Sequence, residues 1–349
     1  MADDTMLTEA ITKKTARQLL DGVATCVRNL AHLFILIFSV FKIGASLLCL
    51  TSTLALAQIP EESQTQAQAR QKLLQDLDSG KIQDAIVLGQ EAVSHWPRDA
   101  QLRHYLGVAY FKTGDSKQAK EQLTLARELD PKDSATNFDL ALVSLSEQDY
   151  PSAADELELV IKLDPSNALA HMLLGRAYLN SNRSLQAVEE FKTTLKLDPS
   201  MKLGHYHLGF AYFSLGRNDE AIAEYKEELR RSGENATVLF ELGRSLLDTG
   251  KYDEASKYLQ RVVELDALNS DAWYNLGKAQ ALAGNTAQAE IALRKAAELN
   301  PKDPSPHYQL ARVLGKLGKS EEARSERQRF AELKKAQPAA SGMATGRDQ

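Results

Sequence analysis

Small apolar residues recur along the chain at a fixed interval of 34 residues. Alanine holds one place in this interval at Ala85, Ala119, Ala153, Ala187, Ala221, Ala255, Ala289 and Ala323. Twelve residues earlier stands a glycine or alanine, at Gly107, Ala141, Gly175, Gly209, Gly243, Gly277 and Ala311. Twelve residues later stands a proline, at Pro97, Pro131, Pro165, Pro199 and Pro301. Self-similarity of this regularity indicates an array of stacked supersecondary units.

Each unit has the pattern of two helices joined by a short turn, and residues 270–303 show it most clearly. Apolar residues follow helical spacing from Asp271 to Ala283, and Gly284 then gives a stop signal. Thr286 is the predicted N-cap of a second helix over 287–299, which Pro301 ends. We call these helix A and helix B, and number positions so that a unit begins at position 1 and the glycine place is position 8. The predicted units are 66–99, 100–133, 134–167, 168–201, 202–235, 236–269, 270–303 and 304–337.

This pattern resembles the tetratricopeptide repeat family, whose unit has the same length. The matching residues in two units are Trp273, Leu276, Gly277, Ala289, Leu293, Ala296 and Pro301, and Leu174, Gly175, Tyr178, Ala187, Phe191 and Pro199. The resemblance implies an all-α, right-handed superhelical solenoid of about eight units that acts as a non-enzymatic scaffold for protein or peptide partners. The first unit departs from the pattern with Leu73 in the glycine place, and Gly233 and Ala267 replace the proline.

The glycines of helix A predict close packing between helices. A glycine within a helix costs about 0.8–1 kcal/mol relative to alanine, so closer contact must offset the loss. We expect glycine on helix A and alanine on helix B to let the two backbones approach each other.

Helix A carries more apolar surface than one interface needs. Positions 4, 8 and 11 form one stripe, and positions 5, 9 and 12 form a second stripe about 100° around the helix. In proteins that this chain resembles, helix A lines the concave face. The second stripe therefore predicts a groove for an extended peptide or a helix. The candidate partner-binding residues are Phe138, Met172, Arg176, Tyr206, Phe210, Phe240, Arg244, Tyr274 and Lys278. The alternative is that these side chains only pack between adjacent A helices.

The first 57 residues hold basic side chains followed by an apolar run that Lys42 interrupts. They read as a signal peptide cleaved after Ala57, or as an uncleaved membrane anchor, or as an artefact in a cytosolic protein. Both membrane interpretations export the repeats, to the periplasm or outer side of the inner membrane, because the basic residues precede the run. Residues 58–65 are a predicted linker and 338–349 a disordered tail.

Charge and motifs restrict the function further. The formal net charge of −5 argues against nucleic acid as the main partner, and both cysteines lie in the first 50 residues. His205 and His207 look like a metal pair but point to different faces of a helix. His171, His205 and His307 occupy position 4, where inter-repeat packing is expected. We expect no cofactor and no metal, and the alternative function is a regulatory or substrate-presenting subunit of an envelope polysaccharide or glycosyl-transfer enzyme.

Overall fold

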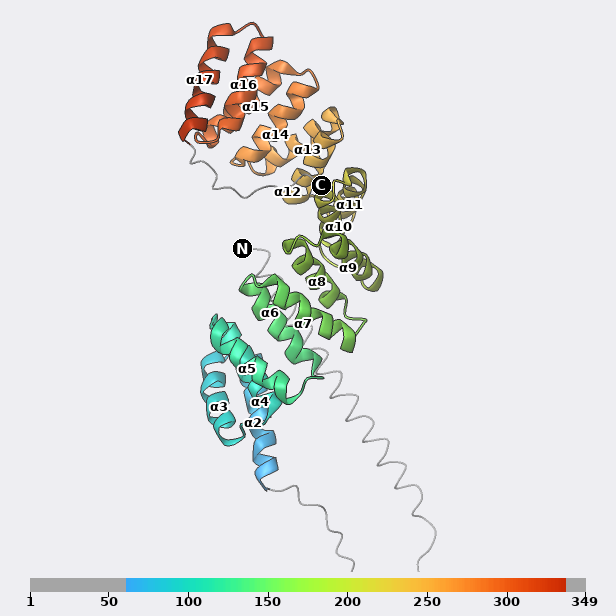
Figure 1. Ribbon diagram of the computed structural model, residues 1–349, viewed down its shortest axis with the longest axis vertical. Helices are drawn as coiled ribbons and strands as arrows, with labels where there is room; N and C mark the ends of the chain where they lie inside the picture. The colour runs from blue at the N-terminus through green and yellow to red at the C-terminus, as the bar shows by residue number, and fades with distance from the viewer. Residues whose placement is uncertain (1–60, 337–349) are drawn as a thin grey trace, which may run out of the picture. The chain divides into compact units, whose positions relative to one another are not determined.

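The computed structural model describes residues 61–336, and within this range all regular structure is α-helical (Figure 1). The predicted signal or anchor segment, the first three residues of the predicted linker and the predicted tail lie outside the described residues. The rest of that linker belongs to the first described helix, which begins at Glu61. Sixteen helices in this range agree with the predicted all-α class.

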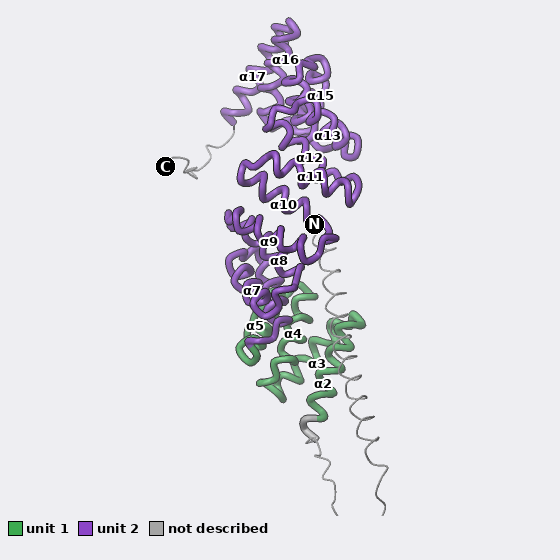
Figure 2. Tube along the Cα trace, turned by 90° about the vertical axis from the view of Figure 1, so that its right-hand side faces the viewer, with its two compact units in different colours: residues 1–130 green, residues 131–349 purple. Residues whose placement is uncertain are grey.

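The chain divides into two compact units, residues 1–130 and 131–349 (Figure 2). In the first unit the helix pairs are α2 (Glu61–Asp78) with α3 (Ile82–His95), and α4 (Ala100–Thr113) with α5 (Ser116–Leu129). The second unit begins with the pairs α6 (Ser134–Ser146) and α7 (Tyr150–Leu163), α8 (Ala168–Asn180) and α9 (Ser184–Leu197), and α10 (Gly204–Ser214) and α11 (Asn218–Ser232). It continues with α12 (Ala236–Asp248) and α13 (Tyr252–Leu265), α14 (Ser270–Leu282) and α15 (Thr286–Leu299), and α16 (Pro304–Lys316) and α17 (Ser320–Ala336).

Most A helices begin after an aspartate or asparagine at position 34 of the preceding repeat. These N-cap side chains accept hydrogen bonds from the first backbone N–H groups, and they are Asp99, Asp133, Asn167, Asn235, Asn269 and Asp303. The cap prediction for α15 was wrong. Asn285 is the N-cap there, and Thr286 is already helical because its hydroxyl donates to the Gly284 carbonyl instead of capping the helix.

The alanine that recurs every 34 residues is fully buried in all eight repeats. The glycine on helix A also makes room for a large side chain of helix B. A Cβ atom built on Gly175 would lie 2.6 Å from Cε1 of Phe191, which is on helix B at position 24 of the repeat. Position 24 fills the same space opposite the other four glycines, with Leu123, Tyr225, Leu259 and Leu293. In the first repeat, Leu73 holds position 8 and Gly89 holds position 24, and a Cβ atom on Gly89 would lie 2.9 Å from Cδ1 of Leu106 on α4.

Position 4 connects several repeats to the one before them. The Arg103 Nε donates to the carbonyl of Pro97 over 2.7 Å, and the Trp273 Nε1 donates to the carbonyl of Ala267 over 2.9 Å. His171 lies 3.2 Å from the Pro165 carbonyl through Nε2, which confirms the inter-repeat role expected for this histidine. In the second unit, successive A helices approach each other more closely than successive B helices do, so the A helices line the inner side of its curve.

Candidate partner-binding surface

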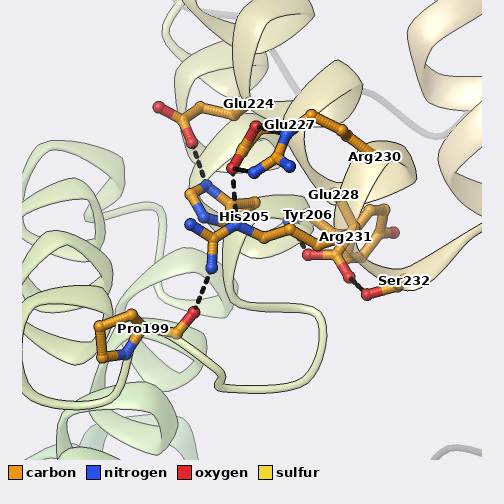
Figure 3. Close-up of polar contacts among 9 residues, drawn as sticks. All are labelled: Pro199, His205, Tyr206, Glu224, Glu227, Glu228, Arg230, Arg231 and Ser232. Atoms are coloured by element: carbon orange, nitrogen blue, oxygen red, sulfur yellow. Dashed lines mark hydrogen bonds and ion pairs between the residues drawn. The ribbon is translucent and has the colours of Figure 1, made fainter.

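The repeat at 202–235 departs from the others where its helix A begins. Met201 stands at the place of the capping aspartate or asparagine and has no side-chain acceptor for the backbone. Helix α10 therefore starts late, at Gly204, after Leu203 in a left-handed conformation with φ of 59°. The carboxylate of Glu228 on α11 accepts a hydrogen bond of 3.3 Å from the Tyr206 backbone N–H (Figure 3). A neighbouring helix thus supplies part of the cap that the local sequence lacks.

Charged residues at the end of α11 secure the same joint. Arg231 donates to the Pro199 carbonyl over 2.8 Å, which is the place that position 4 contacts in other repeats. Hydrogen bonds from Arg230 and Arg231 lower the pKa of Glu227 to about 2, so this carboxylate stays ionised (Figure 3). His205 at position 4 lies 2.6 Å from Glu224 through Nδ1. The joint is therefore formed by side chains of α11.

Aromatic rings gather on α10 directly after this start. The ring of Tyr206 has its centroid 6.3 Å from that of Phe210 and 6.0 Å from that of Tyr225 on α11. Tyr225 is fully buried, its hydroxyl has no hydrogen-bond partner among the described residues, and burial raises its pKa. The buried side of the cluster is therefore apolar except for the unpaired hydroxyl of Tyr225.

Arg244 of α12 joins this cluster to the next A helix. Its guanidinium lies 4.9 Å from the ring centroid of Phe213 on α10 and 5.8 Å from that of Phe240 on α12. It also forms an ion pair of 3.0 Å with Glu241, which is 8% exposed. Burial raises the pKa of Glu241 above its usual range, although Arg244 opposes the shift. The arrangement offers aromatic faces and a cation on one surface, which suits recognition of another polypeptide.

His207 takes no part in a metal pair with His205. Its ring stacks on Phe191 with centroids 5.6 Å apart, whereas His205 turns to Glu224, so the two histidines use different faces as predicted. Burial, with the Arg176 charge as a smaller contribution, lowers the pKa of His207 to about 3. Among residues 61–336, no cluster of histidine, cysteine or acidic side chains has the geometry of a metal site. None of the described helices has the length and apolar character needed to span a bilayer.

Sequence models of the tetratricopeptide repeat match most of this helical array. One matches residues 138–190, 172–236 and 240–304, a second matches 76–136, and a third matches 292–325. The chain belongs to the tetratricopeptide repeat family. Its repeats are of the kind that serves as a scaffold for protein–protein interaction.

One solved structure of another tetratricopeptide repeat protein shares the fold, and two further structures have a lower similarity. The C-terminal part of a repeat protein from Cytophaga hutchinsonii is 15% identical over 66% of this chain and 95% of its own, with a TM-score of 0.57. YrrB, described as a TPR protein with an unusual peptide-binding site, is 24% identical over 54% of this chain and 97% of its own, with a TM-score of 0.49. PilF of Pseudomonas aeruginosa is 20% identical over 59% of this chain and 93% of its own, with a TM-score of 0.49. No curated protein matches the chain significantly.

Four of the nine candidate residues form two pairs on the neighbouring helices α10 and α12, Tyr206 with Phe210 and Phe240 with Arg244. Phe138 lies on α6, Met172 and Arg176 on α8, and Tyr274 and Lys278 on α14. Met172 is only 3% exposed, so little of its side chain is available to a partner. The partner-binding role of all nine residues stays a prediction.

Sequence reasoning did not select four residues that complete this surface, Phe213, Tyr225, Glu228 and Glu241. Phe213 holds position 12 of the second stripe, and it is not among the candidate partner-binding residues. A signal for Glu241 was present, because it precedes Arg244 by three residues on the same helix and can pair with it. No local signal identifies Tyr225 or Glu228, since their contacts come from other helices.

Proposed function

We propose that this protein is a non-enzymatic scaffold that binds a peptide or protein partner on the A-helix surface of residues 131–336. The binding site in this proposal centres on α10 and α12, where Arg244 lies beside the rings of Phe213 and Phe240 and α10 also carries Tyr206 and Phe210. The partner lies across several A helices as an extended segment or a helix, which is how elongated grooves recognise polypeptides.

The position of Arg244 is the observation that carries this proposal. Its guanidinium contacts aromatic rings from two repeats, and yet its side chain remains 37% exposed. Tyrosine and arginine are enriched among the residues that dominate binding energy at interfaces, and aromatic residues in general are enriched there. A cation held between rings is also preorganised, so less side-chain entropy is lost when a partner binds.

We also propose that the repeats work outside the cytoplasm, in the periplasm or at the cell envelope. The basic residues before the apolar run, and the absence of lysine and arginine between Lys42 and Arg70, support export. Fractionation of cells followed by N-terminal sequencing tests this. An intact N-terminus in the cytosolic fraction contradicts the proposal.

Two substitutions test the binding surface. Phe210→Glu places a charge in the aromatic cluster, and Arg244→Gln removes the cation while keeping a side chain that can hydrogen-bond Glu241. The matched control is Ile291→Glu, because Ile291 is 68% exposed on the B helix α15. We expect both surface variants to lose partner capture in crosslinking from the native cell envelope, with helicity and melting temperature close to wild type. Capture that survives both changes, or that Ile291→Glu abolishes equally, refutes the proposed surface.

A further inference from the structure

Three successive A helices carry the same pair of side chains, an aromatic residue at position 5 and a cation at position 9. The pairs are Phe240 and Arg244 on α12, Tyr274 and Lys278 on α14, and Tyr308 and Arg312 on α16. Residues four apart share one face of a helix, so each cation lies beside the ring that precedes it. The Arg244 and Arg312 guanidinium groups each lie 5.8 Å from the ring centroid of their own pair.

The three pairs form one continuous series, which we call the aromatic–cation series. Helix α14 contacts α12 on one side and α16 on the other. Gln309 of α16 lies between the last two pairs, because its side chain opposes the rise that burial causes in the pKa of Tyr274 and accepts from Arg312 over 3.4 Å. Tyr308 is 46% exposed, and its ring packs on Phe330 of α17 at 5.3 Å between centroids. The series is therefore held in place by neighbouring side chains and open to solvent at its C-terminal end.

The cations of the series differ in how far the protein neutralises them. Arg244 is paired with Glu241 at 3.0 Å. Within residues 61–336, Lys278 has neither an ion-pair nor a hydrogen-bond partner, and the hydrogen bond of Arg312 goes to the neutral amide of Gln309. Two positive charges thus stand beside exposed or half-buried tyrosines, and neither forms an ion pair within residues 61–336. Cations in this situation attract the carboxylates of a binding partner.

We propose that the α14–α16 part of the surface binds an acidic segment of a protein partner, with aspartate or glutamate side chains at Lys278 and Arg312. The tyrosine rings cover the methylene groups and apolar neighbours of those acidic residues. This inference rests on the proposed function, and it assigns the partner's chemistry at one end of the same surface. A polyanion such as nucleic acid or an anionic bilayer fits less well, because binding it requires many phosphate contacts, whereas this surface offers two cations without an ion-pair partner within residues 61–336 on a chain of net charge −5.

Selection from a random peptide library tests the charge preference while the partner is still unidentified. The full-length wild-type protein is compared with the double variant Lys278→Gln/Arg312→Gln. A control double variant, Lys257→Gln/Arg324→Gln, removes the same charge from exposed places on α13 and α17. We expect wild type and control to enrich peptides rich in aspartate and glutamate, and the test variant to lose that enrichment.

Affinity measurements give the size of the effect. Two partly exposed ion pairs contribute about 0.3–0.7 kcal/mol each, so the test variant should bind a selected acidic peptide roughly three- to tenfold more weakly at low salt. The difference should shrink as salt is added, because screening weakens exposed ion pairs. A version of the peptide with glutamine for glutamate should bind wild type and test variant equally.

The outcomes separate this inference from the proposed function. Selected peptides that lack acidic residues, or acidic enrichment that persists in the test variant, overturn the inference. The proposed function survives that result if Phe210→Glu still abolishes peptide binding. Failure of every protein to select any peptide, together with partner capture unaffected by Phe210→Glu, overturns both. Binding to phosphatidylglycerol vesicles that depends on Lys278 and Arg312, without binding to acidic peptides, replaces the acidic partner with a lipid surface.

Discussion

The space around Gly277 predicts that adding one methyl group destabilises the repeat at 270–303. A Cβ atom on this residue would lie 2.6 Å from Cγ and 2.9 Å from Cδ2 of Leu293. Carbon atoms pack best at about 3.5–4.0 Å, so the overlap is close to 1 Å. Leu293 is fully buried, and its backbone nitrogen lies 3.2 Å from the same point, so the side chain cannot move aside freely.

Two opposing effects decide the result of Gly277→Ala. Alanine gains about 0.8–1 kcal/mol of helix propensity, and overpacking costs about 1–3 kcal/mol. We expect a net loss of roughly 1 kcal/mol, which lowers the melting temperature by about 2–4 °C for an array of this size. Gly315→Ala is the matched control, because Gly315 is also helical and has no other atom within 4 Å of the added Cβ. That substitution should raise the melting temperature slightly.

A double-mutant cycle with Leu293→Ala identifies the cause. Leu293→Ala alone leaves a cavity and costs about 2–5 kcal/mol. In the double variant the new methyl group of residue 277 occupies part of that cavity, so the two changes should be less damaging than their sum by about 1–2 kcal/mol. The measurement is thermal and urea unfolding followed by circular dichroism. Additive effects, or a Gly277→Ala variant as stable as Gly315→Ala, would refute the knob-and-hole packing.

Three further predictions concern other parts of the second unit. Met201→Asp should restore the missing cap and stabilise the protein by about 1 kcal/mol. The measurement is amide hydrogen exchange at the start of α10, which should become slower. Faster exchange there would contradict the prediction. Ala187→Leu should cost about 1–3 kcal/mol because Ala187 is fully buried, and an unchanged melt argues against the helix crossing. For His207, with a folded pKa of about 3, the unfolded imidazole takes up a proton near pH 6.5 and the folded one does not. This residue alone should lower the unfolding free energy by about 2 kcal/mol from pH 8 to pH 5. His207→Phe should remove that dependence, and parallel stability curves for the two proteins would contradict the buried neutral histidine.

Sequence reasoning reached the fold because one steric requirement returns in every repeat. A fully buried alanine at position 20 excludes larger side chains, so the interval is visible in the sequence itself. The large side chain at position 24 that fills the space beside each helix A glycine was not predicted, because a bulky apolar residue on helix B has no distinctive spacing in the sequence. In the first repeat, position 24 is itself a glycine, Gly89, and Leu106 of the next repeat lies beside it. Such contacts are visible only in the structure.

The candidate surface was less predictable because its chemistry depends on contacts between helices. The spacing of positions 5 and 9 identifies the face that Phe240 and Arg244 occupy. It does not show that Phe213 of the previous A helix lies against the same guanidinium, or that Met172 at position 5 is covered. Burial at one position of a repeat differs between units, since it depends on the size of the neighbours in both adjacent repeats.

The joints between repeats show why the family signature can vary without loss of the fold. An N–H donor that reaches the carbonyl at position 32 of the preceding repeat is supplied by Arg103 or Trp273 at position 4. At 202–235 the histidine of position 4 turns to Glu224, and Arg231 of α11 reaches the Pro199 carbonyl instead. At these joints the constraint is the filled acceptor, because an unpaired carbonyl at a packed joint costs about 1–3 kcal/mol. Side chains that meet this constraint can change, and those at positions 5 and 9 are not bound by it. The side chains at positions 5 and 9 can therefore vary to match the chemistry of the partner.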